Sequence, residues 1–297
     1  MSILNEKENK TKVEVKQVSG RIGAVVTGIK LTGSLDEETT KIVENALLKH
    51  KVLFFRNQTH LTDSEQEAFA RLLGEPISHP TVPVKEGTKH ILELDSDKGG
   101  RADAWHTDVT FTIDYPKITI LRSVKVPEFG GDTVWANTVE AYEHLPESLK
   151  TLAQQLWAVH SNDFDYAARR PTAKKEAVER YKNVFASKVI ETEHPVVRTH
   201  PETGEQTLLL GSFVKRISGL SSSASAHLIA LFQEYITKLE NTVRWQWQEG
   251  DVVIWDNRAT QHYAINDYEG AHRVMSRVTL KGSIPYNIVG EESKPYS

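Results

Sequence analysis

The sequence predicts a β-rich α+β fold that has a double-stranded β-helix (jelly roll) core, flanking helices and a lid insertion. Three observations lead to this prediction. The 297 residues are 39% apolar and 26% charged, which fits one large domain or at most two. Beyond residue 100, short segments rich in β-branched and aromatic residues follow one another closely. Two helical patterns interrupt these segments, over residues 139–156 and 228–239.

The first 75 residues are expected to contribute short strands within 13–29, then two helices. A capping box at Ser34–Glu37 predicts the start of one helix, and a second box at Thr62–Glu65 predicts a helix that ends at Gly74. The apolar run 51–56 between them is expected to be a buried strand.

Most of the predicted strands lie beyond residue 100. Antiparallel hairpins are expected where strands follow one another without a helix, with one turn at Glu249-Gly250. The expected strands are 104–111, 117–124, 132–136, 207–211, 243–247, 251–256, 259–265 and 273–281.

The domain boundaries follow from composition. Polar residues 1–12 are expected to be a disordered tail, and a single domain is expected over 13–297, with its jelly-roll core at roughly 75–285. Residues 160–206 are polar and rich in Arg and Lys, which indicates an insertion. The insertion is expected to be either a mobile lid or a solvated surface loop.

Composition also limits the possible chemistry and partners. The chain has no cysteine, so disulfides, thiolate nucleophiles and cysteine-bound metals are excluded. A net charge of -4 without a long basic run argues against nucleic acid as a partner. The N-terminus lacks an apolar signal core, and no segment approaches a membrane span, so we expect a cytoplasmic protein without membrane contact.

The segment AWHTDVTF at 104–111 places His106 and Asp108 two residues apart. On a strand both side chains would point to one face and could share a metal ion, although such a pair alone is more often an ordinary surface pair. His262 lies in the strand-like ATQHYAI, and a third ligand of this type would complete the 2-His-1-carboxylate pattern of iron(II) oxygenases. A core histidine bonded to backbone is the alternative for His262. The similar His200-Pro201-Glu202 is expected to be a turn without metal.

Two arginines lie four residues apart in AHRVMSRVTL. On a strand, Arg273 and Arg277 would share one face. A buried guanidinium requires an anion, and its planar shape suits a carboxylate or sulfate. Surface salt bridges are the alternative.

At this point the chain resembles the iron(II)- and 2-oxoglutarate-dependent dioxygenases of the taurine dioxygenase family, and within it the bacterial alkylsulfatase branch. The resemblance covers roughly residues 13–285. It rests on HPTVPV at 79–84, WHTDVTF at 105–111, GGDTVWANT at 130–138, WAVHSNDFDY at 157–166, GDVVIWDNRATQHYA at 250–264 and HRVMSRVTLKG at 272–282.

The resemblance implies a role for each matching residue. His106, Asp108 and His262 would hold Fe(II), and Thr133 with Arg273 would hold the far carboxylate of 2-oxoglutarate. O2 would be the second co-substrate, and the third partner would be a small anionic organic substrate. The residues expected to contact that substrate are Arg277, His79, Val82, Val109, Phe111 and Tyr166. Each of the last three is equally compatible with ordinary core packing.

Two positions where this chain differs from the taurine enzyme indicate which substrate to expect. Val82 stands where that enzyme has a tyrosine and Ala102 where it has an asparagine, so the pocket is less suited to an ammonium group. Medium-chain alkyl sulfates are therefore expected, oxidised at the carbon next to the sulfate. Sulfonates such as taurine and phenoxyalkanoate carboxylates are alternatives, as is a non-catalytic jelly-roll binding module. Because members of the family are commonly dimers or tetramers, the resemblance also implies that this chain forms a homo-oligomer.

Overall fold

The computed structural model describes residues 12–98, 102–163, 181–268 and 270–296. Almost all of the expected N-terminal tail therefore lies outside the described residues, and so does Tyr166, one of the expected substrate contacts. No helix in the described part of the chain is long and apolar enough to cross a membrane.

The largest sheet has eight strands, in the order β1-β2-β3-β14-β6-β16-β4, with β5 also paired to β16. The central pairs β14–β6 and β16–β6 are antiparallel, whereas β2 and β3 run parallel. The strands are β1 (Glu14–Gln17), β2 (Ala24–Thr27), β3 (Val52–Phe55), β4 (Pro76–Ile77), β5 (Leu92–Asp95), β6 (Ile118–Lys125), β14 (Val252–Asp256) and β16 (Val274–Leu280).

Three smaller sheets complete the β structure. They have the orders β13-β7-β15, β12-β8-β9-β17 and β10-β11. Their strands are β7 (Thr133–Asn137), β8 (Trp157–Ser161), β9 (Glu191–Pro195), β10 (Val197–Thr199), β11 (Gln206–Leu208), β12 (Val214–Ile217), β13 (Thr242–Trp245), β15 (Thr260–Ala264) and β17 (Lys294–Pro295).

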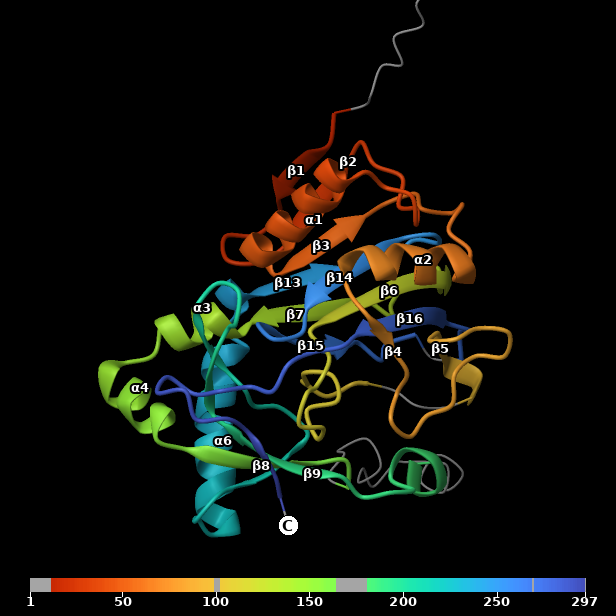
Figure 1. Cartoon of the computed structure of the whole chain (residues 1–297). Coiled ribbons are helices and arrows are strands. Elements are labelled where there is room, and N and C mark those ends of the chain that lie inside the picture. The colour runs from red at the N-terminus through yellow and green to blue at the C-terminus, as the bar shows by residue number, and fades with distance from the viewer. Residues whose placement is uncertain (1–11, 99–101, 164–180, 269, 297) are drawn as a thin grey trace, which may run out of the picture.

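The helices cover both ends of this β structure. In Figure 1, α1 and α2 lie over the large sheet, and α6 lies beside β8. The helices are α1 (Glu37–His50), α2 (Asp63–Leu73), α3 (Thr138–Glu143), α4 (Glu147–Gln154) and α6 (Ser222–Ile236), with shorter turns η1 (Ser96–Lys98), η3 (Tyr181–Phe185) and η4 (Leu239–Asn241).

The core is divided into layers by the sheets. One apolar cluster joins α1 and α2 to the outer face of the large sheet. An aromatic cluster that includes Phe54, Trp135 and Trp255 fills the space between the large sheet and the three-stranded sheet. A third cluster packs α6 through Phe232 against β8 and β12. The candidate site lies where β15, of the three-stranded sheet, approaches β16, of the large sheet, as described below.

The predicted start of the second helix is confirmed, and that of the first is wrong. Thr62 Oγ1 accepts a hydrogen bond from Glu65 N, and α2 ends before Gly74. The first helix is capped by Asp36, whose carboxylate accepts from Thr39 N, so Ser34 is not its cap. A carboxylate is as good a cap as a hydroxyl, and the run SLDEE offers both.

The expected single helix over 139–156 is two helices, because Pro146 interrupts the pattern and precedes α4. The expected hairpins in 243–265 are also wrong. Strand β14 pairs with β3 and β6, while its chain neighbours β13 and β15 both pair with β7. The run 252–256 is buried on both faces, so it takes a central position in the large sheet, and its neighbours enter the other sheet.

The insertion expected over residues 160–206 is shorter than predicted. Strands β9 and β10 occupy 191–195 and 197–199 within it, and their side chains are almost all buried. His194 and Arg198 look polar in the sequence, yet both are buried in the protein with hydrogen-bond partners. Polarity over 191–199 therefore indicated buried, hydrogen-bonded side chains rather than a solvated surface.

Candidate metal centre and anion site

His106, Asp108 and His262 come together in the protein, and one ligand atom of each lies within 4.8 Å of the others. His106 and His262 face each other across an isolated β-bridge, closed by His262 N donating to His106 O (2.8 Å) and His106 N donating to His262 O (3.1 Å). The two Nε2 atoms lie 3.8 Å and 3.9 Å from Asp108 Oδ1. These separations leave room for an ion between the three donors.

The segment 104–111 is not a strand, which corrects the prediction. It pairs with β15 only at His106 and then enters turns. Val109, directly after Asp108, has φ of 59°, in the left-handed region that β-branched residues rarely adopt. Such a backbone costs about 1–3 kcal/mol and requires support from its surroundings. Asp108 therefore reaches the two imidazoles from a strained turn, and not by the side-chain alternation of a strand.

Both imidazoles have a lone pair available for a metal ion. His106 Nδ1 lies 2.7 Å from Ala104 O and must donate to it, so in the neutral ring the lone pair is on Nε2. Burial, followed by the neighbouring His106, lowers the pKa of His262 well below its usual value. The His262 ring is therefore neutral at pH 7, the form that binds metal ions.

Asp108 is buried and ionised. Burial acts to raise the pKa of its carboxyl, but the Arg277 guanidinium leads the interactions that outweigh burial and hold the pKa below its usual range. Thr119 Oγ1 donates to Oδ2 (2.9 Å), and Arg277 Nη1 donates to Oδ1 (2.7 Å). Two neutral imidazole nitrogens and one carboxylate, all buried and separated by an ion-sized gap, fit a ferrous ion.

Arg273, directly before β16, has the properties of an anion receptor. Its side chain is buried, and its Nε has no hydrogen-bond partner among the described residues. Burial lowers the pKa of its guanidinium, and the nearby carboxylate of Asp132 is hydrogen-bonded to Arg244 Nε (2.6 Å). A buried guanidinium nitrogen without a partner fits a ligand that brings its own carboxylate, as 2-oxoglutarate does.

Gly131 adjoins Arg273, and Thr133 lies two residues further along the chain, at the start of β7. Thr133 Oγ1 accepts a hydrogen bond from Trp247 Nε1 (3.0 Å), so its own hydrogen remains available to a carboxylate. Gly131 has φ of 70°, and a Cβ there would lie 3.2 Å from Arg273 Cδ. Glycine at 131 thus gives the arginine its room.

His79 and Arg277 form a second cationic and hydrogen-bonding group. His79 Nδ1 accepts from Val82 N (3.0 Å) and Thr81 N (3.2 Å), which places its proton on Nε2. Burial, followed by Arg277, lowers the pKa of His79 to about 3. The neutral ring can therefore donate from Nε2 to an anion, although it cannot supply charge. Arg277 Nε is also buried without a hydrogen-bond partner among the described residues.

An apolar cluster lies beside this group. Val109 and Phe111, both predicted, are buried together with Phe213, and Phe185 and Ile190 pack against them. Phe213 lies edge-on to His106 at 6.0 Å between ring centroids. Sequence reasoning missed Phe213 and Phe185, because a phenylalanine in an irregular segment carries no periodic signal. The predicted Val82 is half-buried in the loop after His79.

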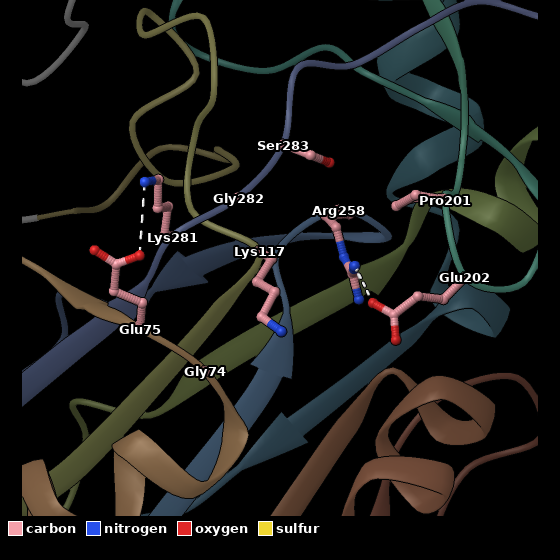
Figure 2. A pocket seen from close by; sticks show the side chains of 9 residues that line it. All are labelled: Gly74, Glu75, Lys117, Pro201, Glu202, Arg258, Lys281, Gly282 and Ser283. Carbon is pink, nitrogen blue, oxygen red and sulfur yellow. Dashed lines mark hydrogen bonds and ion pairs between the residues drawn. The ribbon is translucent and has the colours of Figure 1, made fainter.

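A surface pocket of about 370 Å³ lies apart from these residues and shares none of them. Figure 2 shows that its two salt bridges join Arg258 to Glu202 and Lys281 to Glu75. Arg258 also bonds Asp256 through both Nε and Nη2, so its charge is already neutralised. We therefore place the candidate site at the triad and not in this pocket.

Comparisons with known proteins identify the family of the chain. The family model described as "Taurine catabolism dioxygenase TauD, TfdA family" matches residues 14–279. The chain belongs to the TauD/TfdA family. That family was predicted from the motifs, and the prediction is confirmed.

Two similar TauD/TfdA relatives have names that describe sulfate ester chemistry. The chain is 57% identical to the alpha-ketoglutarate-dependent sulfate ester dioxygenase of Pseudomonas putida, over 95% of this chain and 94% of the relative. It is also 57% identical to the alkylsulfatase of Acinetobacter baylyi, over 95% and 89% of the two chains. A putative alpha-ketoglutarate-dependent taurine dioxygenase from Burkholderia xenovorans superposes with a TM-score of 0.83 at 35% identity, covering 96% and 98% of the chains.

Proposed function

We propose that the protein is an Fe(II)- and 2-oxoglutarate-dependent dioxygenase that oxidises an alkyl sulfate ester at the carbon next to the sulfate. The products would be an aldehyde, inorganic sulfate, succinate and CO2. The observation that carries the proposal is the His106–Asp108–His262 cluster, which lies beside an anion receptor and an apolar wall. The names of the two relatives that are 57% identical support the choice of substrate.

The residues divide the binding of the co-substrates between them. His106, Asp108 and His262 would hold the iron, and Arg273 with Thr133 would hold the far carboxylate of 2-oxoglutarate. When bound, iron and 2-oxoglutarate activate O2 at the expense of 2-oxoglutarate decarboxylation. The contribution of the chain is to bind, orient and exclude water.

Charge counting assigns the two arginines to different anions. Asp108 cancels one charge of a ferrous ion, and the near carboxylate of 2-oxoglutarate cancels the other. The far carboxylate then requires Arg273, whose buried Nε has no protein partner among the described residues. Arg277 donates to Asp108 through Nη1 (2.7 Å), but its buried Nε has no partner among the described residues, so Arg277 would bind the second anion, the sulfate of the substrate.

Orientation of the substrate follows from this second anion site. Arg277 and the Nε2 proton of His79 would hold the sulfate, and the alkyl tail would extend along Val109, Phe111 and Phe213. Each buried methylene of the tail contributes about 0.8 kcal/mol. Held at its head, the ester presents its first carbon to the metal centre.

Hydroxylation of that carbon makes the ester unstable. The carbon then bears both a hydroxyl and the sulfate oxygen, and the bond to the sulfate oxygen breaks with its electron pair leaving on sulfate. The hydroxyl loses its proton and becomes the carbonyl of the aldehyde. This sequence needs no acid or base beyond water, which agrees with a site where burial keeps His79 and His262 neutral.

The experiment that tests the substrate compares sulfate release from hexyl sulfate with sulfite release from taurine, with 2-oxoglutarate and Fe(II) supplied. We expect hexyl sulfate to have the higher kcat/KM, because the wall beside Arg277 is apolar. Faster turnover of taurine would reject the substrate assignment. Succinate formed from a phenoxyalkanoate in the same assay would point to a carboxylate as the second anion.

Three finer points belong to the same proposal. The facing eight-stranded and three-stranded sheets would form the jelly-roll core, within one dioxygenase domain that covers residues 13–297. The protein would assemble as a dimer or tetramer, which sedimentation would measure.

A further inference from the structure

One buried amide makes two hydrogen bonds to the backbone of Asp108, in the turn before Val109, and a third to Pro116. Asn257 Oδ1 accepts from Asp108 N (2.9 Å), and its Nδ2 donates to Asp108 O (3.1 Å) and to Pro116 O (2.9 Å). The Asn257 side chain is fully buried. The amide therefore binds both sides of the Asp108 backbone, as a neighbouring strand would, at the position where the chain has left the sheet.

The turn needs this support because its next residue is Val109 at a φ of 59°. Val109 O accepts hydrogen bonds from Thr112 N and Thr112 Oγ1, each 3.0 Å long, which close the turn on the far side of Val109. On the Asp108 side, the backbone N and O are both held by Asn257. A β-branched residue left without such contacts would relax to a negative φ and move the carboxylate of Asp108.

Asn257 is itself held firmly in the chain. Its backbone N donates to Lys117 O (2.9 Å), at the start of β6. On either side of it, Asp256 and Arg258 bond each other, and His200 Nε2 bonds Asp256 Oδ2 (2.9 Å). Arg258 continues to Glu202, which Figure 2 shows at the surface pocket. The buried ion cluster thus fixes the backbone from which the Asn257 amide extends.

We propose that Asn257 is a positioning residue of the metal centre, whose amide holds the strained Asp108–Val109 turn so that the carboxylate faces His106 and His262. The inference rests on the proposed metal function of the triad. It assigns Asn257 no contact with metal or substrate, so its effect acts through the position of Asp108.

The test is Mn(II) affinity, measured by titration of the metal-free full-length protein. Loss of partners of this kind weakens metal binding by about 10–100-fold, and we expect that range for Asn257→Ala. Asn241→Ala is the matched control. Asn241 is equally buried, and it bonds Tyr235 O (2.8 Å) and Arg21 Nη1 (2.7 Å), neither of which belongs to the site. The control should lower thermal stability and leave Mn(II) affinity unchanged.

A second variant separates positioning from general loss of structure. Glycine adopts positive φ freely, so in the Val109→Gly background the turn should persist without the amide. Asn257→Ala should then weaken Mn(II) binding by less than about threefold, a coupling that a double-mutant cycle measures. If Asn257→Ala does not fold, Asn257→Asp, which keeps the acceptor but loses both donors, takes its place in the same cycle.

Each result decides between the inference and its alternatives. Unchanged Mn(II) affinity in Asn257→Ala, or an equal loss with Val109 and with Gly at position 109, would overturn the positioning role. If the unsubstituted protein bound no Mn(II), or if His262→Ala bound it equally well, the proposed metal centre would fail instead.

Discussion

Two buried clusters of histidine and carboxylate lie at the two ends of the segment 256–262. The back cluster contains Asp256 and the triad contains His262, and the two clusters differ in how closely the histidines approach the carboxylate. In the back cluster, His200 Nε2 bonds Asp256 Oδ2 directly at 2.9 Å, and Arg258 bonds both carboxylate oxygens. In the triad, both Nε2 atoms stay 3.8–3.9 Å from Asp108. In the back cluster the histidine bonds the carboxylate directly, whereas in the triad Asp108 pairs with Arg277 (2.7 Å) and both histidines stay apart from it, which leaves a gap for an ion.

The comparison shows that residue type alone does not make a metal site. His200 and Glu202 offer the same ligand types as His106 and Asp108 at the same spacing. In the protein, Glu202 turns to Arg258 and His200 turns to Asp256, so the pair never converges. Residues 201–203 form the turn that was predicted for this segment. What distinguishes the triad is its third member from β15 and the strained turn that keeps Asp108 at a distance.

The largest expected effect is at the triad. Asp108→Asn keeps the shape of the side chain and removes the negative charge, so kcat/KM for sulfate release should fall at least about 10⁴-fold, or about 5 kcal/mol of transition-state stabilisation. Mn(II) affinity should fall in parallel. If turnover stayed within tenfold of that of the unsubstituted enzyme, the triad would not be the metal site, and its contrast with the back cluster would no longer hold.

Arg277→Gln tests the second anion site, the one proposed to bind the sulfate of the substrate. Loss of one partner of a buried charge pair costs about 3–5 kcal/mol, so affinity for an alkyl sulfate should fall by roughly two to four decades. The measurement is the KM for hexyl sulfate, together with the KM for 2-oxoglutarate as the internal control. An equal rise in both constants would contradict the division of the two anions between Arg273 and Arg277.

Asp256→Asn tests the back cluster. The fully buried Arg258–Asp256 pair would lose its charge, and the free energy of unfolding should fall by about 3–5 kcal/mol in urea denaturation. The folded fraction should still bind Mn(II), with at most a modest loss through Asn257. A loss of metal affinity as large as that of Asp108→Asn would mean that the back cluster belongs to the metal site.

The neutral buried imidazoles predict acid sensitivity. His79 and His194 have pKa values of about 3, below the usual 6.5, first because of burial. Below pH 6.5 the unfolded chain binds protons that the folded chain does not. The free energy of unfolding should therefore fall as pH falls from 6.5 towards 3, by up to about 1.4 kcal/mol per pH unit for each imidazole. His194→Gln should reduce the dependence of the unfolding free energy on pH by the contribution of one imidazole. An unchanged dependence would contradict a buried, neutral His194.

The smallest effect is expected at the exposed salt bridge of the surface pocket shown in Figure 2. Lys281 and Glu75 are both more than half exposed and lie 3.6 Å apart. Lys281→Ala should change the free energy of unfolding by less than about 0.5 kcal/mol and leave Mn(II) affinity unchanged. An effect comparable to that of Asp256→Asn would show that burial does not explain the different contributions of the Lys281–Glu75 and Arg258–Asp256 pairs to stability.

Much of the β structure could be predicted from residue patterns. The strands from β6 onward that carry site residues, such as β7, β15 and β16, were expected within one or two residues of their ends. Their partners were not, because alternation of apolar residues says which side is buried but not which neighbour covers it. The 104–111 segment was misjudged for a related reason. Its β-branched residues favour a strand, and the Asn257 amide outweighs that preference from 149 residues away.

The amino-acid sequence alone determined the family, the ligand types of the proposed metal centre and the presence of two arginines four residues apart, since these depend on which side chains occur and in what order. Tertiary structure decided which histidine and carboxylate keep an ion-sized gap and which close on each other. It also decided that a distant amide supports the turn that presents Asp108. The physical reason is that distances between charged groups, and the cost of burying them, are set by the packing of strands remote in the chain.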